Sequence, residues 1–212
     1  MTDRLRELLE QCPVVPVVTV EDVRHAVPLA RALQAGGIDV IEVTLRSDAA
    51  WGAIERIREE LPEVRAGVGT AVRAGDLERA QAAGAAFAVS PGLVPDLVRR
   101  AADLGLPYLP GVASASEVMA ALGLGLETLK FFPARPAGGI PMLKAFAPVF
   151  PTVRFCPTGG VTPDDLGDYL GLPNVVCVGG SWLTPGPALQ AGDWEQITRL
   201  AAAAIDRAGR TA

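Results

Sequence analysis

The chain has 212 residues, half of them hydrophobic, and a formal net charge of -5. This length suits a single domain over residues 1–212 with a full hydrophobic core. No uninterrupted apolar run is long enough to cross a bilayer, which argues against a membrane protein. The acidic balance and the lack of a basic run argue against nucleic acid as the main partner.

The first residues and the few cysteines indicate a cytoplasmic protein. Residues 1–7 mix charged and apolar residues without an apolar central stretch, which is typical of an amphipathic helix rather than a signal peptide. Cys12, Cys156 and Cys177 are odd in number and show no CxxC spacing, as expected for thiols in a reducing compartment. His25 is the only histidine, which excludes a multi-histidine metal site and allows a Ser-His-Asp triad only through this residue.

Short apolar runs rich in β-branched residues alternate along the chain with stretches of helical periodicity. The predicted strands are 14–20, 40–45, 66–70, 87–90, 108–111, 128–133, 153–157 and 175–178, and the predicted helices are 23–35, 49–60, 74–83, 95–104, 116–122, 141–150, 162–169 and 194–207. Eight strand–helix units predict an α/β fold with a parallel sheet, closed into a (β/α)8 TIM barrel with an additional N-terminal helix. A doubly wound open sheet is the alternative, but residues 19–22 lack its glycine-rich fingerprint.

The second predicted strand carries three polar side chains near its end. Alternation places Glu42, Thr44 and Arg46 on one face of this strand. Polar groups on a buried strand are costly unless they are paired or functional. A structural ion pair of Glu42 with Arg46 or with Lys130 is therefore the alternative to a catalytic role for this carboxylate.

Lys130 is one of only two lysines, with Lys144, among seventeen arginines. It lies in the apolar run 128–133, whereas Lys144 is expected on a solvated helix surface. Arginine stays protonated, but a buried lysine can lose its proton and become a nucleophile. The alternative is a structural lysine that caps the strand or pairs with a carboxylate.

In a barrel of this class, functional groups gather at the carboxyl ends of the strands. Paired glycines, 159–160 and 179–180, follow the last two predicted strands, where many such barrels expose backbone N–H groups to a phosphate. Two ordinary tight turns are the alternative. Thr70 at the end of the third strand offers a hydroxyl at the same rim.

An uncharged lysine that attacks a ketone explains this set of residues. Glu42 can then move protons on the covalent intermediates, and Arg46 can bind a substrate carboxylate in fork fashion. The sequence contains neither a metal-ligand cluster nor a dinucleotide fingerprint, so no metal and no other cofactor are expected.

Six motifs along nearly the whole chain are similar to those of the KDPG/KHG aldolases. These are bacterial class I aldolases that cleave 2-dehydro-3-deoxy-6-phosphogluconate. The motifs are EVTLR (42–46), GT (69–70), SPG (90–92), KFFPA (130–134), CPTGG (156–160) and GGSW (179–182), with PVVPV (13–17) at the first strand.

The resemblance implies a carbon–carbon lyase of carbohydrate metabolism, in the Entner-Doudoroff pathway, that releases pyruvate and glyceraldehyde 3-phosphate. Lys130 would form the Schiff base, and Glu42 would act as general acid and base. The implied substrate-binding residues are Arg46 and Thr70 at the carboxylate, Pro91 and Phe132 lining the pocket, and Thr158, Gly159, Gly160, Gly179, Gly180 and Ser181 around the phosphate. A cytoplasmic homotrimer that needs no metal is also implied.

Two positions depart from the family pattern. Arg135 stands where the family commonly carries a glutamate, and Ser114 lies where a threonine is expected nearby. Both lie near the mouth of the barrel and bear on the preferred aldehyde and its stereochemistry. The same chemistry on 2-dehydro-3-deoxy-6-phosphogalactonate or 4-hydroxy-2-oxoglutarate is therefore an alternative.

Two alternatives lie outside the aldolases. A phosphosugar isomerase or epimerase on the same barrel would use Glu42 as a base without covalent chemistry. A non-catalytic phosphate-binding protein would keep Lys130 paired with Glu42.

Overall fold

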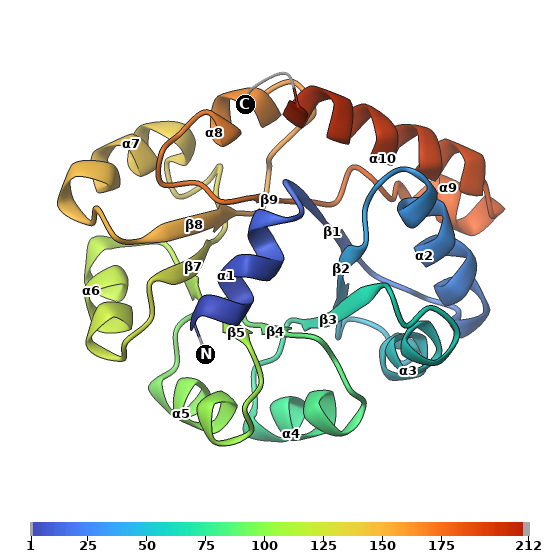
Figure 1. Cartoon of the computed structure of the whole chain (residues 1–212), viewed down its shortest axis with the longest axis horizontal. Helices are drawn as coiled ribbons and strands as arrows, with labels where there is room; N and C mark the ends of the chain where they lie inside the picture. The colour runs from blue at the N-terminus through green and yellow to red at the C-terminus, as the bar shows by residue number, and fades with distance from the viewer. Residues whose placement is uncertain (1, 210–212) are drawn as a thin grey trace.

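Parallel strands alternate with helices along the chain in the computed structural model, which describes residues 2–209 (Figure 1). The strands are β1 (Val14–Val18), β2 (Val40–Thr44), β3 (Arg65–Gly69), β4 (Ala88–Val89), β5 (Tyr108–Leu109), β6 (Gly111–Val112), β7 (Thr128–Phe131), β8 (Arg154–Pro157) and β9 (Val178–Gly180). The helices are α1 (Thr2–Glu10), the 3-10 helix η1 (Val23–His25), α2 (Ala26–Ala35), α3 (Ala50–Glu60), α4 (Ala74–Ala82), α5 (Pro95–Asp103), α6 (Ala115–Gly123), α7 (Gly139–Val149), α8 (Leu166–Leu170), α9 (Gly186–Ala191) and α10 (Trp194–Gly209).

Neighbouring strands are parallel and nearly follow the order of the chain. One sheet has the order β5-β4-β3-β2-β1-β9, and a second has the order β6-β7-β8. Two isolated parallel bridges, Phe155 with Val175 and Thr158 with Gly179, join β8 to the segment that contains β9. The strands curl around a common axis and the helices lie outside them (Figure 1). The predicted α/β class with parallel strands is confirmed.

The two sheets meet at Pro110, where the predicted strand 108–111 is broken. Its first half, β5, pairs with β4, and its second half, β6, pairs with β7. Proline has no N–H to donate to a ladder. The Pro110 carbonyl still accepts a hydrogen bond from the Lys130 N–H at 2.9 Å. The prediction of one continuous strand is therefore wrong at this residue.

Several other elements differ from the prediction. The helix predicted at 162–169 begins only at Leu166, as α8. The first turn of the predicted helix 23–35 is the 3-10 helix η1, because the Asp22 carboxylate accepts the Arg24 N–H and tightens the turn. The short helix α9 was not predicted, since Pro185 and Gly186 at its start indicate a turn. The last strand, β9, is shifted toward its glycines relative to the predicted 175–178.

Phenylalanines pack the outer face of β7 and β8 against α7. Phe131 of β7 meets Phe146 of α7 and Phe155 of β8 edge-on, with ring centroids 6.2 and 6.3 Å apart. Side chains alternate along a strand. Because Phe131 points outward into this cluster, Lys130 points inward, toward the axis of the strands.

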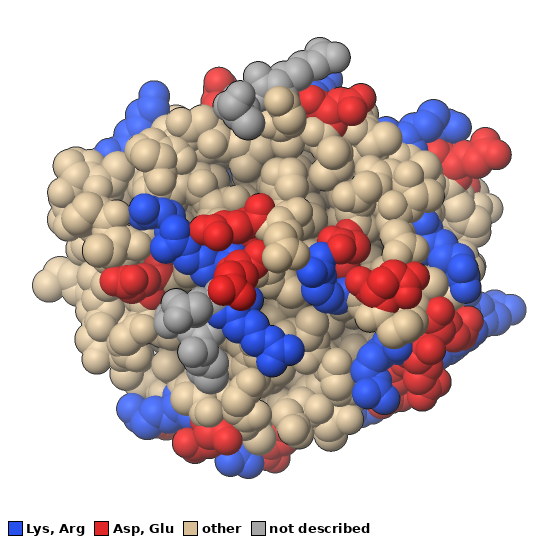
Figure 2. All heavy atoms as spheres, in the orientation of Figure 1, with Lys and Arg blue, Asp and Glu red and all other residues tan. Residues whose placement is uncertain are grey.

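Helix α1 crosses the amino ends of the strands (Figure 1). Leu5 and Leu9 are buried beneath it, whereas Arg6 and Glu10 form an ion pair at 2.7 Å on its outer face. Basic and acidic side chains are interspersed over this side of the molecule (Figure 2). Among residues 2–209, no helix is long and apolar enough to span a membrane.

We expect Phe155→Ala to lower the free energy of unfolding by about 3–5 kcal/mol, because the substitution leaves a cavity in a fully buried cluster. Met119→Ala is the control, since Met119 is 63% exposed and its truncation should change stability by less than about 0.5 kcal/mol. Urea unfolding of both variants measures the difference. Equal losses in the two variants would contradict this assignment of the core.

Candidate active site

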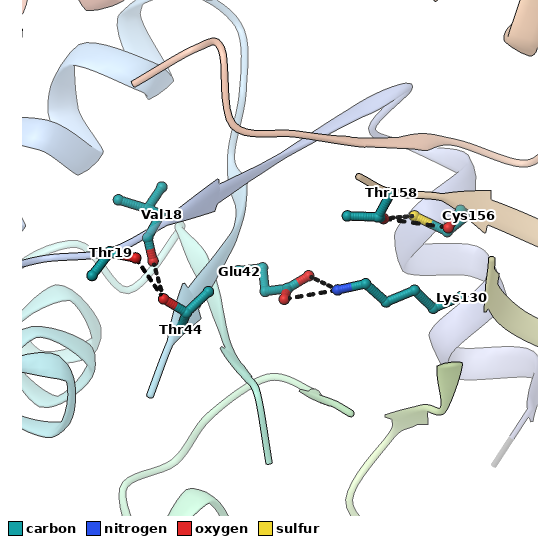
Figure 3. A network of polar contacts seen from close by, with 7 residues as sticks. All are labelled: Val18, Thr19, Glu42, Thr44, Lys130, Cys156 and Thr158. Carbon is teal, nitrogen blue, oxygen red and sulfur yellow. Dashed lines mark hydrogen bonds and ion pairs between the residues drawn. The ribbon is translucent and has the colours of Figure 1, made fainter. Parts of the chain in front are cut away.

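Lys130 and Glu42 meet inside the ring of strands, although 88 positions separate them in sequence. The ammonium Nζ of Lys130 donates to Oε1 and Oε2 of Glu42 at 3.0 and 3.2 Å (Figure 3). Lys130 is 5% exposed and Glu42 is 4% exposed. Of the two ion pairs considered from the sequence, the one with Lys130 is present, and Glu42 does not pair with Arg46.

Two glycines make room for this ion pair. A Cβ on Gly69 would lie 2.4 Å from Oε1 of Glu42, so any larger residue would displace the carboxylate. Gly111 is the ladder partner of Lys130, and a Cβ there would lie 2.2 Å from the Pro91 carbonyl oxygen. Only glycine fits these two positions without moving the groups around the lysine.

Pro91 lies at the edge of the site rather than on the ion pair. Its side chain is exposed, and its carbonyl rests against Gly111. The turn is fixed by Ser90, whose hydroxyl donates to the Gly92 carbonyl at 2.7 Å and accepts from the Tyr108 hydroxyl at 2.6 Å. Burial raises the pKa of this tyrosine, so it remains a donor at neutral pH.

Two threonine hydroxyls form a polar wall beside Glu42 (Figure 3). Thr44 was expected on the same face as Glu42, whereas Thr19 was not predicted to contribute. Thr44 donates to the Val18 carbonyl at 3.0 Å, and its oxygen lies 2.9 Å from the hydroxyl oxygen of Thr19 (Figure 3). Because Thr44 gives its proton to Val18, Thr19 is the donor between the two hydroxyls. The available signal was Thr19 itself, a polar residue within the apolar run 14–20.

Cys156 and Thr158 line the other side of the lysine. Cys156 is the ladder partner of Lys130, and its Sγ lies 3.9 Å from Oγ1 of Thr158 (Figure 3). A hydrogen bond with Cys177 lowers the pKa of the Cys156 thiol, and the positive charge of Lys130 lowers it as well. Burial raises this pKa but does not outweigh them. A Cβ on Gly179 would lie 2.2 Å from Oγ1 of Thr158, which explains this glycine.

The paired glycines 159 and 160 form an open turn next to the lysine strand. Both have positive φ values, +97° and +83°, which favour glycine. A Cβ on Gly159 would lie 3.3 Å from the Phe132 ring, and this ring in turn lies 5.2 Å from Nζ of Lys130. Within residues 2–209, the N–H groups of Gly160 and Ser181 donate no hydrogen bond, so both are available to an anion.

The remaining predicted residues lie around the mouth of the site. Arg46 and Ser181 line one cavity of about 530 Å³, together with Thr19 and His25. Arg46 is exposed, and its guanidinium has no ion-pair partner among the described residues. A Cβ on Gly180 would lie 2.2 Å from the Trp182 ring, so this ring lies directly over the turn.

Thr70 has a backbone conformation that is rare for its residue type. It follows β3 with φ of +63°, in the left-handed region. A β-branched residue in this region is strained, and such strain is typical of functional positions. The strained residue directly follows Gly69, the glycine that accommodates Glu42.

Known proteins that are identical to this chain at close to half of the aligned positions are aldolases. The family model for KDPG and KHG aldolase matches residues 5–200. The KHG/KDPG aldolase of Escherichia coli strain K12 is 48% identical over 201 residues, which cover 95% of this chain and 94% of that protein. The chain belongs to the KDPG and KHG aldolase family.

Two solved structures extend the similarity to the fold. The KDPG aldolase of Legionella pneumophila, with pyruvate captured as a covalent carbinolamine intermediate, matches with a TM-score of 0.92 and 47% identity over 94% of this chain and 97% of that chain. The 2-keto-3-deoxy-6-phosphogluconate aldolase of Zymomonas mobilis with 3-phosphoglycerate matches with a TM-score of 0.90 and 46% identity over 96% of each chain.

We expect Thr70→Gly to raise the free energy of unfolding by about 1 kcal/mol, because glycine adopts a positive φ without the steric cost. Thr70→Ala is the matched control, since it removes the hydroxyl but keeps the strain. Chemical denaturation compares the two variants with the wild type. A glycine variant no more stable than the alanine variant would show that Thr70 is not strained.

Proposed function

We propose that this protein is a class I aldolase that cleaves 2-dehydro-3-deoxy-6-phosphogluconate into pyruvate and glyceraldehyde 3-phosphate. The observation that carries the proposal is the buried contact between the Lys130 ammonium and both oxygens of Glu42. Family membership supports the same reaction. The relative captured with pyruvate as a covalent carbinolamine supports attack by a lysine amine.

Imine formation uses Lys130 as nucleophile and Glu42 as proton carrier. Glu42 lies at hydrogen-bond distance from Nζ and takes a proton from it, which frees the lone pair to attack the C2 carbonyl. The resulting carbinolamine keeps the new C–N bond. The protonated carboxyl then gives its proton to the carbinolamine hydroxyl, which leaves as water, and a protonated imine remains.

Cleavage follows because the protonated imine accepts electrons. The Glu42 carboxylate removes the proton of the C4 hydroxyl, the C3–C4 bond breaks, and its electrons pass into the imine to give an enamine. Glyceraldehyde 3-phosphate leaves at this point. Glu42 then returns the proton to C3, and water hydrolyses the imine to release pyruvate and restore the Lys130 amine.

We assign the carboxylate and the phosphate of the substrate to two separate sets of polar groups at the mouth. The unpaired guanidinium of Arg46 and the hydroxyl of Thr70 bind the carboxylate. Pro91 and Phe132 border the pocket, and Thr158 lies beside the reacting atoms. The phosphate accepts hydrogen bonds at the two glycine turns, which consist of Gly159, Gly160, Gly179, Gly180 and Ser181.

The free N–H groups of Gly160 and Ser181 favour a phosphorylated substrate over an unphosphorylated one. The same machinery would act on 2-dehydro-3-deoxy-6-phosphogalactonate, which differs only in configuration. Activity on 4-hydroxy-2-oxoglutarate is supported by the Escherichia coli relative named for both substrates. Comparing turnover of the three compounds ranks these substrates.

Incubation with pyruvate and borohydride, followed by digestion and mass spectrometry, tests the nucleophile. We expect a reduced pyruvyl adduct on Lys130 and none on Lys144, which is exposed on α7. Lys130→Arg keeps the positive charge beside Glu42 but cannot form an imine. We therefore expect this variant to lose about a thousandfold or more in kcat, with no adduct.

Lys144→Arg is the matched control and should retain full activity and the Lys130 adduct. An adduct on Lys144 alone would overturn the proposed mechanism. Partial activity of Lys130→Arg without any adduct would instead favour an isomerase or epimerase that uses Glu42 as its base.

We further propose that the whole chain forms one closed (β/α)8 barrel domain and acts as a cytoplasmic homotrimer. Closure is supported by the two bridges between β8 and the β9 segment and by the hydrogen bond from the Lys130 N–H to the Pro110 carbonyl, where the two sheets meet. The three buried free thiols support a reducing compartment. The trimer is supported by the resemblance of the motifs to those of the family.

Sedimentation equilibrium tests the oligomeric state. We expect a single species with three times the chain mass of 22.0 kDa, independent of loading concentration in the micromolar range. A monomer or dimer under these conditions would contradict the trimer but leave the mechanism untouched, because Lys130 and Glu42 come from the same chain.

A further inference from the structure

We propose that Arg135 makes this enzyme selective for a phosphorylated aldehyde half. This inference rests on the proposed function, because it concerns the group that occupies the turn formed by Gly159 and Gly160. Arg135 lies in the loop between β7 and α7, five residues after Lys130. The loop runs alongside the glycine turn.

The backbone fixes Arg135 next to that turn. The Ala134 N–H donates to the Thr158 carbonyl at 2.8 Å, and the Arg135 N–H donates to the Gly159 carbonyl at 2.9 Å. The two loops are therefore paired directly beyond the ends of β7 and β8. This pairing fixes the backbone of Arg135 relative to the turn.

The stem of Arg135 passes over Gly160. A Cβ on Gly160 would lie 2.6 Å from the Arg135 Cβ and 3.3 Å from its Cδ. The Gly160 N–H on the same turn has no acceptor among residues 2–209. The stem of an arginine thus lies beside a residue whose backbone N–H is free to bind an anion.

Asp165 forms an ion pair with the Arg135 guanidinium. Its Oδ2 accepts from Nη2 of Arg135 at 2.6 Å, and its Oδ1 accepts the Thr162 N–H at 2.7 Å. The Arg135 side chain is 60% exposed and the Asp165 side chain is 22% exposed. The aspartate is therefore the fixed partner, and the arginine is the one that can turn toward a ligand.

Arg135 distinguishes phosphorylated from unphosphorylated substrates by their charge. A phosphate monoester carries nearly two negative charges at neutral pH and presents oxygens that match the guanidinium fork. The unphosphorylated 2-dehydro-3-deoxygluconate has only a hydroxyl at that end. Arg135 should therefore stabilise the phosphorylated substrate and leave the other almost unaffected, and this advantage should shrink with added salt.

The test is the ratio of kcat/KM for the two compounds, which differ only in the phosphate. We expect Arg135→Gln to lower kcat/KM for the phosphorylated compound about five- to tenfold, mainly through KM, and Arg135→Glu to lower it further. Neither variant should change kcat/KM for the unphosphorylated compound by more than about twofold. The loss in Arg135→Gln should be largest at low ionic strength.

Asp165→Asn shows whether the selectivity comes from the charge of Arg135 or from the structural link between Arg135 and Asp165. In this variant the amide oxygen still accepts the Thr162 N–H, but the negative charge beside Arg135 is removed. The ratio of kcat/KM for the phosphorylated compound to that for the unphosphorylated compound should therefore stay the same or rise. Arg99→Gln is the control, because Arg99 on α5 is as exposed as Arg135 and also pairs with an aspartate, Asp96. This control should leave the ratio unchanged.

Two results would overturn the inference. One is an equal loss for both compounds in Arg135→Gln, and the other is an Asp165→Asn variant that reproduces that loss. Trapping pyruvate on Lys130 in every variant separates this failure from a failure of the proposed function. A wild-type protein without an adduct would remove the function and the inference together, whereas a normal adduct with an unchanged ratio would remove only the role of Arg135.

Discussion

The buried ion pair of Lys130 and Glu42 is the interaction on which the rest of the site depends. Two charges taken out of water lose much of their hydration, and only good geometry and polar neighbours offset that loss. Gly69 and Gly111 let the groups approach, and the polar side chains of Cys156 and Thr158 lie on the neighbouring strand β8 and just beyond it. A pair with this environment is ready to exchange a proton, because the two heavy atoms already lie at hydrogen-bond distance.

Much of this arrangement could be predicted from the sequence because it depends on local patterns. Alternating apolar runs and helical stretches fix a parallel α/β fold. Lys130 stands out as a lysine in an apolar strand of an arginine-rich chain, and Glu42 as a carboxylate in another such strand. Once both strands are taken as parts of one ring, their side chains must point to the same interior.

What could not be predicted depends on pairing across the ring. Nothing in the sequence chooses between Arg46 and Lys130 as the partner of Glu42, since strand curvature decides which side chains meet. The break at Pro110 and the link between Asp165 and Arg135 likewise involve contacts between distant segments. The role of Thr19 could not be predicted for a different reason, because single hydroxyls are common near strand ends and only its hydrogen bond with Thr44 distinguishes it.

Helix α1 has a consequence for the order of events in catalysis. It covers the amino ends of the strands, so the reacting lysine is approached from the carboxyl ends. In the proposed binding mode the C2 carbonyl reaches the buried Lys130, whereas the carboxylate and the phosphate stay at the mouth. The aldehyde fragment leaves through this same opening, while the three-carbon enamine stays bonded to Lys130 until it is protonated and hydrolysed. Helix α1 thus restricts both substrate entry and product release to the carboxyl ends of the strands.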